Sequence, residues 1–150
     1  MSALATAAIL AQNGIEPILQ FTTRDRNRIA IQGDLLGGWA LDIPNILCLY
    51  GDEVKGGDQP DTKEVRDLDT IGILRTAHEI KTKKMYPSGR KIKDAPKFFI
   101  GGADTPFKVN NDFDGSNLLK KIEAGVEFFQ TQYAFDKNLL KNYMLKLNKL

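Results

Sequence analysis

The sequence predicts an α/β fold in which about four parallel strands alternate with helices. Apolar runs rich in β-branched or aromatic residues recur four times, and each is short enough for a buried strand. These runs cover residues 18–21, 46–50, 98–101 and 126–130. Stretches with helical spacing separate them, so crossovers must join the strands, and crossovers make neighbouring strands parallel and cover the sheet with helices. The pattern alone fits a closed barrel as well as an open sheet.

Apolar residues at helical spacing predict five helices, each with one face to bury. The first is alanine-rich, from about residue 2 to residue 12, and Asn13 with Gly14 suits its C-terminal end. Gly125 is suited to end the fourth helix, and Asp136 to accept amide hydrogens at the start of the fifth. The apolar faces of the second to fifth helices are predicted at Ile29, Leu35, Leu36, Trp39 and Ala40; at Leu68, Ile71, Leu74 and Ala77; at Leu118, Leu119 and Ile122; and at Leu140, Met144 and Leu147.

Length and composition indicate one soluble globular domain of 150 residues, of which 42% are apolar and 27% charged. The single cysteine, Cys48, lies in an apolar run, and since no disulfide can form within the chain, a reducing compartment is expected. The net charge of +2 comes partly from the lysine-rich residues 81–97, which we interpret as a solvated connector rather than a nucleic-acid patch. Residues 1–10 are apolar but short and lack a basic leader, so we expect a cytoplasmic protein without a membrane span.

Small and polar residues follow every predicted strand, which is where ligand sites form in parallel α/β folds. They occupy residues 22–26, 51–53, 102–105 and 131–133. Helix caps and turns favour the same residue types, so a structural role remains open at each position. The signal is stronger at Asp52, because neighbouring Gly51 would let a flat ligand approach the backbone. Gly101 and Gly102 could admit a planar ring in the same way, or could be packing glycines.

Several catalytic motifs are absent from the sequence. Gly33, Gly37 and Gly38 fall inside a predicted helix, so they form neither a dinucleotide fingerprint nor a phosphate-binding loop. The single histidine, His78, lies beside Glu79 on the third helix and is expected at the surface. No spacing of Cys and His suits a metal, so we expect no metal site. A serine nucleophile elbow and a Cys and His pair are also absent.

Six segments occur in an informative order, at residues 16–17, 20–28, 49–52, 67–69, 121–125 and 130–136. Together they resemble the methylenetetrahydrofolate reductase family, over a stretch from about Ile15 to Asp136. Each segment is weakly specific, whereas their order and spacing are fairly specific. The resemblance implies a (β/α)8 TIM barrel that carries FAD, in which the strands here correspond to the third through sixth. Residues 1–150 are then expected to form a single partial barrel domain, with the first two and last two strands outside this sequence.

The resemblance also implies an activity. Family members pass a hydride from NAD(P)H to FAD, and then from reduced flavin to the one-carbon bridge of 5,10-methylenetetrahydrofolate. The product, 5-methyltetrahydrofolate, serves one-carbon metabolism and methionine biosynthesis. The flavin supplies this chemistry, and the protein orients the flavin and tunes its charge. We therefore expect FAD as cofactor, NAD(P)H as co-substrate, a folate substrate, and no nucleic-acid or membrane partner.

The resemblance assigns site residues position by position. Asp52 falls on the flavin-adjacent aspartate, a catalytic position where negative charge would favour the cationic iminium form of the opened folate. Gln132 falls on the substrate-contacting glutamine, which suits the donor and acceptor edge of a pterin. Cofactor contacts are assigned to Thr22, Leu49, Tyr50, Gly51, Asp52, Asp69, Asn117, Lys120 and Lys121.

The family pattern is not matched throughout. Gln20 stands where many members have histidine, and Tyr50 where many have arginine. The family's general acid is a glutamate on the first barrel strand, expected outside this sequence. The isolated chain is therefore expected to be inactive, or to need a second copy or a partner chain to complete the barrel. Two other functions remain open: a flavin- or folate-binding protein without turnover, and a folate-dependent methyltransferase barrel without flavin.

Overall fold

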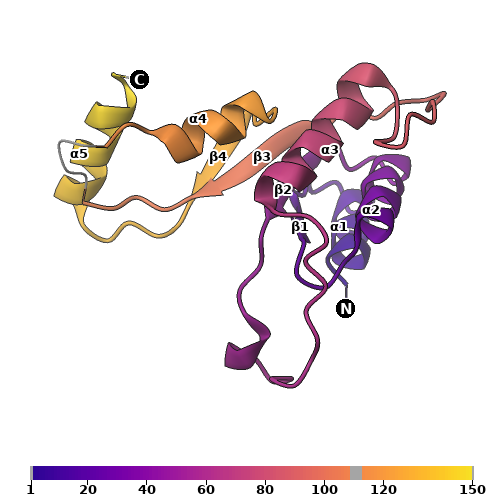
Figure 1. The fold of residues 1–150 in the computed structure, drawn as a ribbon, viewed down its shortest axis with the longest axis horizontal. Coiled ribbons are helices and arrows are strands. Elements are labelled where there is room, and N and C mark those ends of the chain that lie inside the picture. Colours follow the sequence, from indigo (N-terminus) through magenta and orange to yellow (C-terminus); the bar gives the residue numbers. More distant parts are fainter. Residues whose placement is uncertain (1, 109–112, 150) are drawn as a thin grey trace.

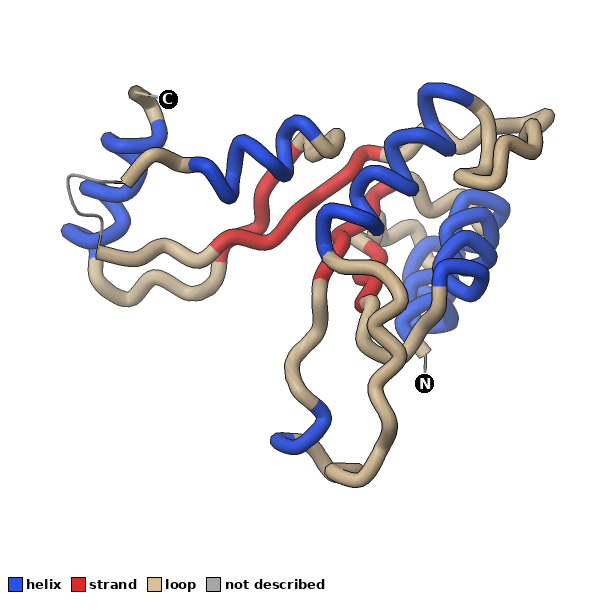
Figure 2. The backbone as a smooth tube through the Cα atoms, viewed as in Figure 1, coloured by secondary structure: helices blue, strands red, loops and turns tan. Residues whose placement is uncertain are grey.

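The computed structural model describes residues 2–108 and 113–149 and confirms the predicted order of elements (Figures 1 and 2). Four strands form one parallel sheet in the order β1-β2-β3-β4. They are β1 (Leu19–Thr22), β2 (Asn45–Leu49), β3 (Phe99–Asp104) and β4 (Phe128–Thr131). The helices are α1 (Ala3–Gln12), α2 (Arg28–Ala40), α3 (Thr70–Lys83), α4 (Ser116–Glu123) and α5 (Lys137–Leu147), and a 3-10 turn, η1 (Val54–Gly56), follows β2. Parallel strands in chain order, with a helix between each pair, are the arrangement of a TIM-barrel segment.

The hydrophobic core lies between the sheet and helices α1 to α3, each of which contacts the next along the chain, and Ala124 and Val126, which follow α4, complete it. Phe21 of β1, Ile46 and Cys48 of β2, and Ile100 of β3 point into this core and are almost fully buried. Burial raises the pKa of the Cys48 thiol to about 12, so this cysteine is an unreactive apolar group. Alternate strand residues point to the other face, which we call the open face because Phe99 on it is 47% exposed, although Leu47 on the same face is buried.

The predicted buried face of α2 is partly wrong. Leu35 is fully buried as expected, but Ile29 is 77% exposed and Ile31 is buried in its place. The reason lies at Gly38, where an added Cβ would be 3.0 Å from a methyl group of Leu19. Helix α2 therefore turns its glycine side toward β1, and this close approach sets the rotation of the helix.

The apolar faces of α4 and α5 are also less buried than predicted. Leu118 of α4 is buried, whereas Ile122 is 51% exposed. In α5, Met144 is 44% exposed, and the buried residue is Tyr143, which the predicted face does not include. Figure 1 shows the cause, because α5 lies beyond the carboxyl ends of β3 and β4 rather than against the sheet. Within residues 2–108 and 113–149, no helix is long and apolar enough to cross a membrane.

The predicted helix ends are confirmed. Asn13 is the C-cap of α1, and the Asp136 carboxylate accepts two backbone amide hydrogens at the start of α5. Gly125 has a φ of +104° in the turn after α4, and an added Cβ there would be 2.6 Å from the Cβ of His78. His78 is therefore half-buried against this turn, and its predicted place at the surface is wrong.

The lysine-rich connection between α3 and β3 forms a small hairpin. The Tyr86 N–H donates to the Arg90 carbonyl and the Ile92 N–H to the Lys84 carbonyl, each at 2.8 Å. Most of its residues are exposed, in agreement with a solvated connector. Since the connection leads into β3, it lies at the amino end of the sheet, away from the carboxyl ends where a ligand site is expected.

Candidate functional site

A cavity of about 630 Å³ opens at the carboxyl ends of β2 and β3. The end of β2, the segment after β3 and the start of α4 line it, and Tyr143 reaches it from α5. The volume lies within the range of small-molecule sites, roughly 300–1,000 Å³. The cavity therefore occupies the edge of the sheet at which the sequence predicts a ligand site.

The polar groups of the cavity are held in fixed positions. The Lys121 ammonium donates to the carbonyl of Ala103 at 2.5 Å, and the Tyr143 hydroxyl donates to the Asp104 carboxylate at 2.8 Å. Burial, together with this bond to Asp104, raises the pKa of Tyr143, so the hydroxyl remains a donor. The Asp114 carboxylate accepts a backbone N–H at the start of α4, which lowers the pKa of Asp114.

Four of the predicted cofactor contacts line this cavity: Leu49, Tyr50, Asn117 and Lys121. Lys120 is exposed on α4 and lies outside the cavity lining. The Asp69 carboxylate accepts the Gly72 N–H at 2.6 Å and so caps α3, while its neighbour Thr70 lines the cavity. The assignment of these residues to a cofactor stays a prediction. Asp69 also has a structural role, because it caps α3.

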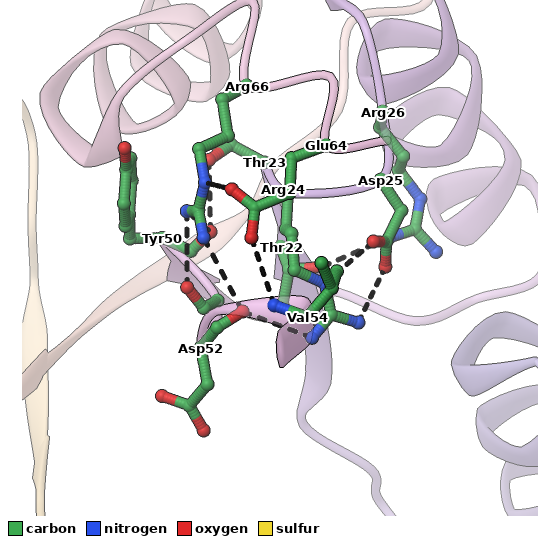
Figure 3. A network of polar contacts seen from close by, with 11 residues as sticks. Thr22, Thr23, Arg24, Asp25, Arg26, Tyr50, Asp52, Val54, Glu64 and Arg66 are labelled. Carbon is green, nitrogen blue, oxygen red and sulfur yellow. Dashed lines mark hydrogen bonds and ion pairs between the residues drawn. The ribbon is translucent and has the colours of Figure 1, made fainter. Parts of the chain in front are cut away.

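Thr22, Gly51 and Asp52 belong to a network that joins the loops after β1 and β2 (Figure 3). Gly51 has a φ of +88°, and an added Cβ would be 3.0 Å from the Cβ of Arg24 and 3.1 Å from that of Thr22. The Thr22 hydroxyl accepts from the Arg26 guanidinium at 3.3 Å. A glycine is required at position 51 because the two loops approach each other closely on this side of the backbone.

Arg66 completes this network from the far end of the segment between β2 and α3, residues 50–69, which we call the β2 loop. The Arg66 guanidinium donates to the carbonyls of Tyr50, Gly51 and Asp52 at 3.3, 3.2 and 3.4 Å. Its central carbon lies 3.9 Å from the centre of the Tyr50 ring, and its Nε pairs with Glu64. Many family members have arginine at position 50. In this chain position 50 is tyrosine, and the guanidinium of Arg66 lies against its ring.

Two ion pairs of the β2 loop, Arg66 with Glu64 and Arg28 with Asp67, keep the two carboxylates ionised and hold the loop in place. The bond from Arg66, followed by the bond from the Val54 N–H, lowers the pKa of Glu64 to about 2. Arg28 pairs with both carboxylate oxygens of Asp67 at 2.8 Å, which lowers the pKa of Asp67 to about 2. Both carboxylates are therefore ionised at neutral pH, and they attach the loop to the start of α2 and to its own first residues.

Asp52 and Gln132 follow β2 and β4, which are separated in the sheet by β3 alone. The Asp52 carboxylate is exposed and points away from the network in Figure 3, with no hydrogen bond among the described residues. Gln132 is exposed, and its N–H extends the β3–β4 pairing by donating to the Asp104 carbonyl at 2.8 Å. Neither side chain lines the cavity, and in Figure 1 the segments after β2 and β4 leave the sheet in different directions. A shared ligand for the two stays a prediction.

The two glycines of β3 have packing roles. An added Cβ at Gly101 would be 2.6 Å from the ring atom Cε2 of Phe128, and one at Gly102 would be 3.1 Å from a methyl group of Val126. The sequence left open whether these glycines admit a planar ligand or serve close packing. In the structure, neighbouring side chains pack against both of them.

Sequence reasoning missed Arg66, Glu64 and Tyr143. Arg66 and Tyr143 act through contacts with residues far away in the chain, and Glu64 acts by holding Arg66. None of the three belongs to a motif or a strand end. A signal existed for Tyr143, since it shares a helical face with Leu139 and Leu140. Residues 2–108 and 113–149 contain no group of three or more His, Cys, Asp or Glu side chains that could hold a metal ion.

Comparison with known proteins gives one result. The sequence profile described as methylenetetrahydrofolate reductase matches residues 1–150, the whole chain. No curated protein sequence matches it significantly. The profile agrees with the parallel α/β sheet, because the family is built on a TIM barrel. The chain belongs to the methylenetetrahydrofolate reductase family.

Proposed function

We propose that this chain serves the flavin-dependent reduction of 5,10-methylenetetrahydrofolate to 5-methyltetrahydrofolate, with FAD as cofactor and NAD(P)H as co-substrate. Family membership indicates a methylenetetrahydrofolate reductase-type function in one-carbon metabolism. The observation that carries the finer proposal is the cavity at the carboxyl ends of β2 and β3, lined by four of the residues that the resemblance assigns to the cofactor.

The cavity lining suits the parts of FAD. Leu49 and Tyr50 offer aliphatic and aromatic surface to a planar ring. Asn117 offers an amide to hydroxyl groups, and the Lys121 ammonium offers a positive charge to a diphosphate. The Asp114 carboxylate can accept hydrogen bonds from a ribose. When bound, FAD supplies the hydride-transfer chemistry.

The proposed role of Asp52 depends on its free carboxylate. The side chain is exposed and accepts no hydrogen bond among the described residues, so its charge is available to a ligand. A carboxylate beside the reacting carbon would stabilise the positive charge that the opened folate carries. Gln132, also exposed, would offer one donor and one acceptor to the pterin edge.

Titration of the chain with FAD tests the proposal. We expect saturable binding of one equivalent, measured as a change in flavin absorbance, and tighter binding of 5-methyltetrahydrofolate once FAD is present. Folate binding without flavin binding would favour the methyltransferase barrel. Flavin binding without NAD(P)H oxidation is the result expected of the isolated chain, whereas the same result in a completed barrel would favour the protein without turnover. Failure to bind either ligand would contradict the proposal.

We further propose that additional strands, from a second copy or a partner chain, cover the open face of the sheet. Among the described residues β1 and β4 are edge strands, and Phe99 on the open face is 47% exposed. A closed barrel would pair both edges and bury this face. Sedimentation should then show an assembly of defined stoichiometry, whereas a monomer at every concentration would contradict a second copy.

A further inference from the structure

We propose that Arg66 is the positioning residue for the turn at residues 50–52, and that its guanidinium fixes the backbone from which Asp52 presents its carboxylate. The inference rests on the proposed function, because that function gives Asp52 its importance. The contacts themselves are independent of any ligand.

The hydrogen bonds of Arg66 converge on one turn. Three successive carbonyls, those of Tyr50, Gly51 and Asp52, accept hydrogen bonds from one guanidinium at 3.2–3.4 Å. The same planar group lies 3.9 Å from the centre of the Tyr50 ring. Each bond is long, but all of them come from a charged donor and restrain the same turn. Figure 3 shows the guanidinium between the Tyr50 ring and the carbonyls.

Arg66 is itself held in place. Its Nε pairs with the Glu64 carboxylate, whose other oxygen accepts the Val54 N–H at 3.0 Å. The side chain of Arg66 is only 15% exposed. Its backbone has a φ of +42°, which residues with a side chain seldom adopt, so the surrounding contacts must maintain it. Glu64, Arg66 and residues 50–54 thus form a closed ring of interactions.

Among the described residues, nothing restrains the Asp52 side chain directly. Its carboxylate accepts no hydrogen bond among the described residues, so its direction depends on its backbone. Arg24 adds one bond to the Asp52 carbonyl at 3.2 Å, but its other nitrogens are paired with Asp25. The Thr23 hydroxyl likewise donates only to the Tyr50 carbonyl, at 3.1 Å, so among the described residues Arg66 is the side chain that restrains all three carbonyls.

Lysine cannot take this role. An ammonium is a compact point charge, whereas the guanidinium presents a rigid planar fork and a face that stacks on an aromatic ring. Arg66→Lys keeps the charge and loses the geometry. A matched control is Arg28→Lys, because Arg28 anchors the same loop through Asp67 and contacts neither Tyr50 nor Asp52.

Backbone NMR order parameters of the ligand-free chain give the decisive measurement. In the wild-type chain, residues 51–53 should be rigid, with order parameters near ~0.85, and Arg66→Lys should lower them toward ~0.6. Arg28→Lys should leave them unchanged. Equal changes in both variants, or none in Arg66→Lys, would overturn the inference. Should Arg66→Lys fail to fold, the wild-type Nε–H resonance of Arg66 decides: slow exchange with water supports the inference, and fast exchange overturns it.

FAD titration separates this inference from the proposed function. If FAD binds, Arg66→Lys should weaken its affinity about tenfold and Arg28→Lys should not. If the wild-type chain binds no FAD but Arg66→Lys still loosens residues 51–53, the proposed function fails and the positioning role stands. If FAD binds equally to all three proteins and residues 51–53 remain rigid, the positioning role fails alone.

Discussion

The ring of Phe128 lies directly against the backbone of Gly101, so that an added Cβ would be 2.6 Å from the ring atom Cε2. Phe128 also stacks on Phe99, with ring centroids 4.8 Å apart. The two contacts tie β4 to β3 on the open face of the sheet. They explain why a glycine occupies the middle of a strand, where glycine is otherwise unfavourable.

Gly101→Ala should therefore destabilise the chain, by about 1–3 kcal/mol, since the new methyl group must displace the Phe128 ring. The matched control is Gly33→Ala, where no atom lies within 4 Å of the added Cβ and the residue is inside α2. That variant should be stabilised by roughly 0.5–1 kcal/mol. Urea denaturation measures both, and equal effects would contradict the packing role.

Asp69 offers a test of two roles at one position. Its carboxylate caps α3, so Asp69→Ala should cost about 1 kcal/mol of unfolding free energy, while Asp69→Asn should cost little because asparagine is an equally good cap. Thermal denaturation measures the difference. If FAD affinity falls only in the alanine variant, capping accounts for the residue, whereas a loss in both variants would support the predicted cofactor contact.

The ion pairs of the β2 loop predict a pH dependence. The pKa values of Glu64 and Asp67 are lowered to about 2 in the folded chain, below their ordinary values of about 4. Their contribution to stability is therefore present above pH ~4.5 and lost as the pH falls toward 2. The double variant Glu64→Gln, Asp67→Asn should flatten the acid limb of a plot of unfolding free energy against pH. An unchanged limb would show that the pairs contribute nothing.

Tyr143 should stabilise the position of α5. Tyr143→Phe removes the donor to Asp104 and should cost about 1–2 kcal/mol. Because the pKa of Tyr143 is raised in the folded state, its contribution is complete below pH ~10 and is lost as the pH rises further. Tyr133→Phe is the control, since Tyr133 is 87% exposed and should be neutral. Equal stability of the two variants up to pH 11 would contradict this role.

The strands could be predicted because their evidence is local. Four apolar runs separated by helical stretches are sufficient for a parallel sheet in chain order, and the caps at Asn13 and Asp136 follow from side-chain chemistry. The rotation of α2 could not be predicted, because it depends on how closely Gly38 approaches Leu19 in another element. Apolar spacing favoured Ile29 instead.

The candidate site likewise has one part that could be predicted from the sequence and one part that could not. That polar residues such as Asp52 gather at one edge follows from topology, which a sequence pattern can indicate. The contact of Arg66 with Tyr50 depends on the path of the segment between β2 and α3, which has no periodicity to interpret. Tyr143 reaches the cavity for a comparable reason, because α5 leaves the sheet.

The most direct test of the account is the dissociation constant for FAD in paired variants at opposite ends of the sheet. Asn117→Ala and Lys121→Gln alter the cavity at the carboxyl ends of β2 and β3, whereas Lys97→Gln alters a lysine-lined cavity at the amino end. Loss of a charged hydrogen bond of about 1.5 kcal/mol should weaken FAD binding roughly tenfold in the Lys121 variant, with Lys97→Gln equal to the wild-type chain. Affinity that is unchanged by Asn117→Ala and Lys121→Gln, or lowered equally by Lys97→Gln, would contradict a flavin site in this cavity.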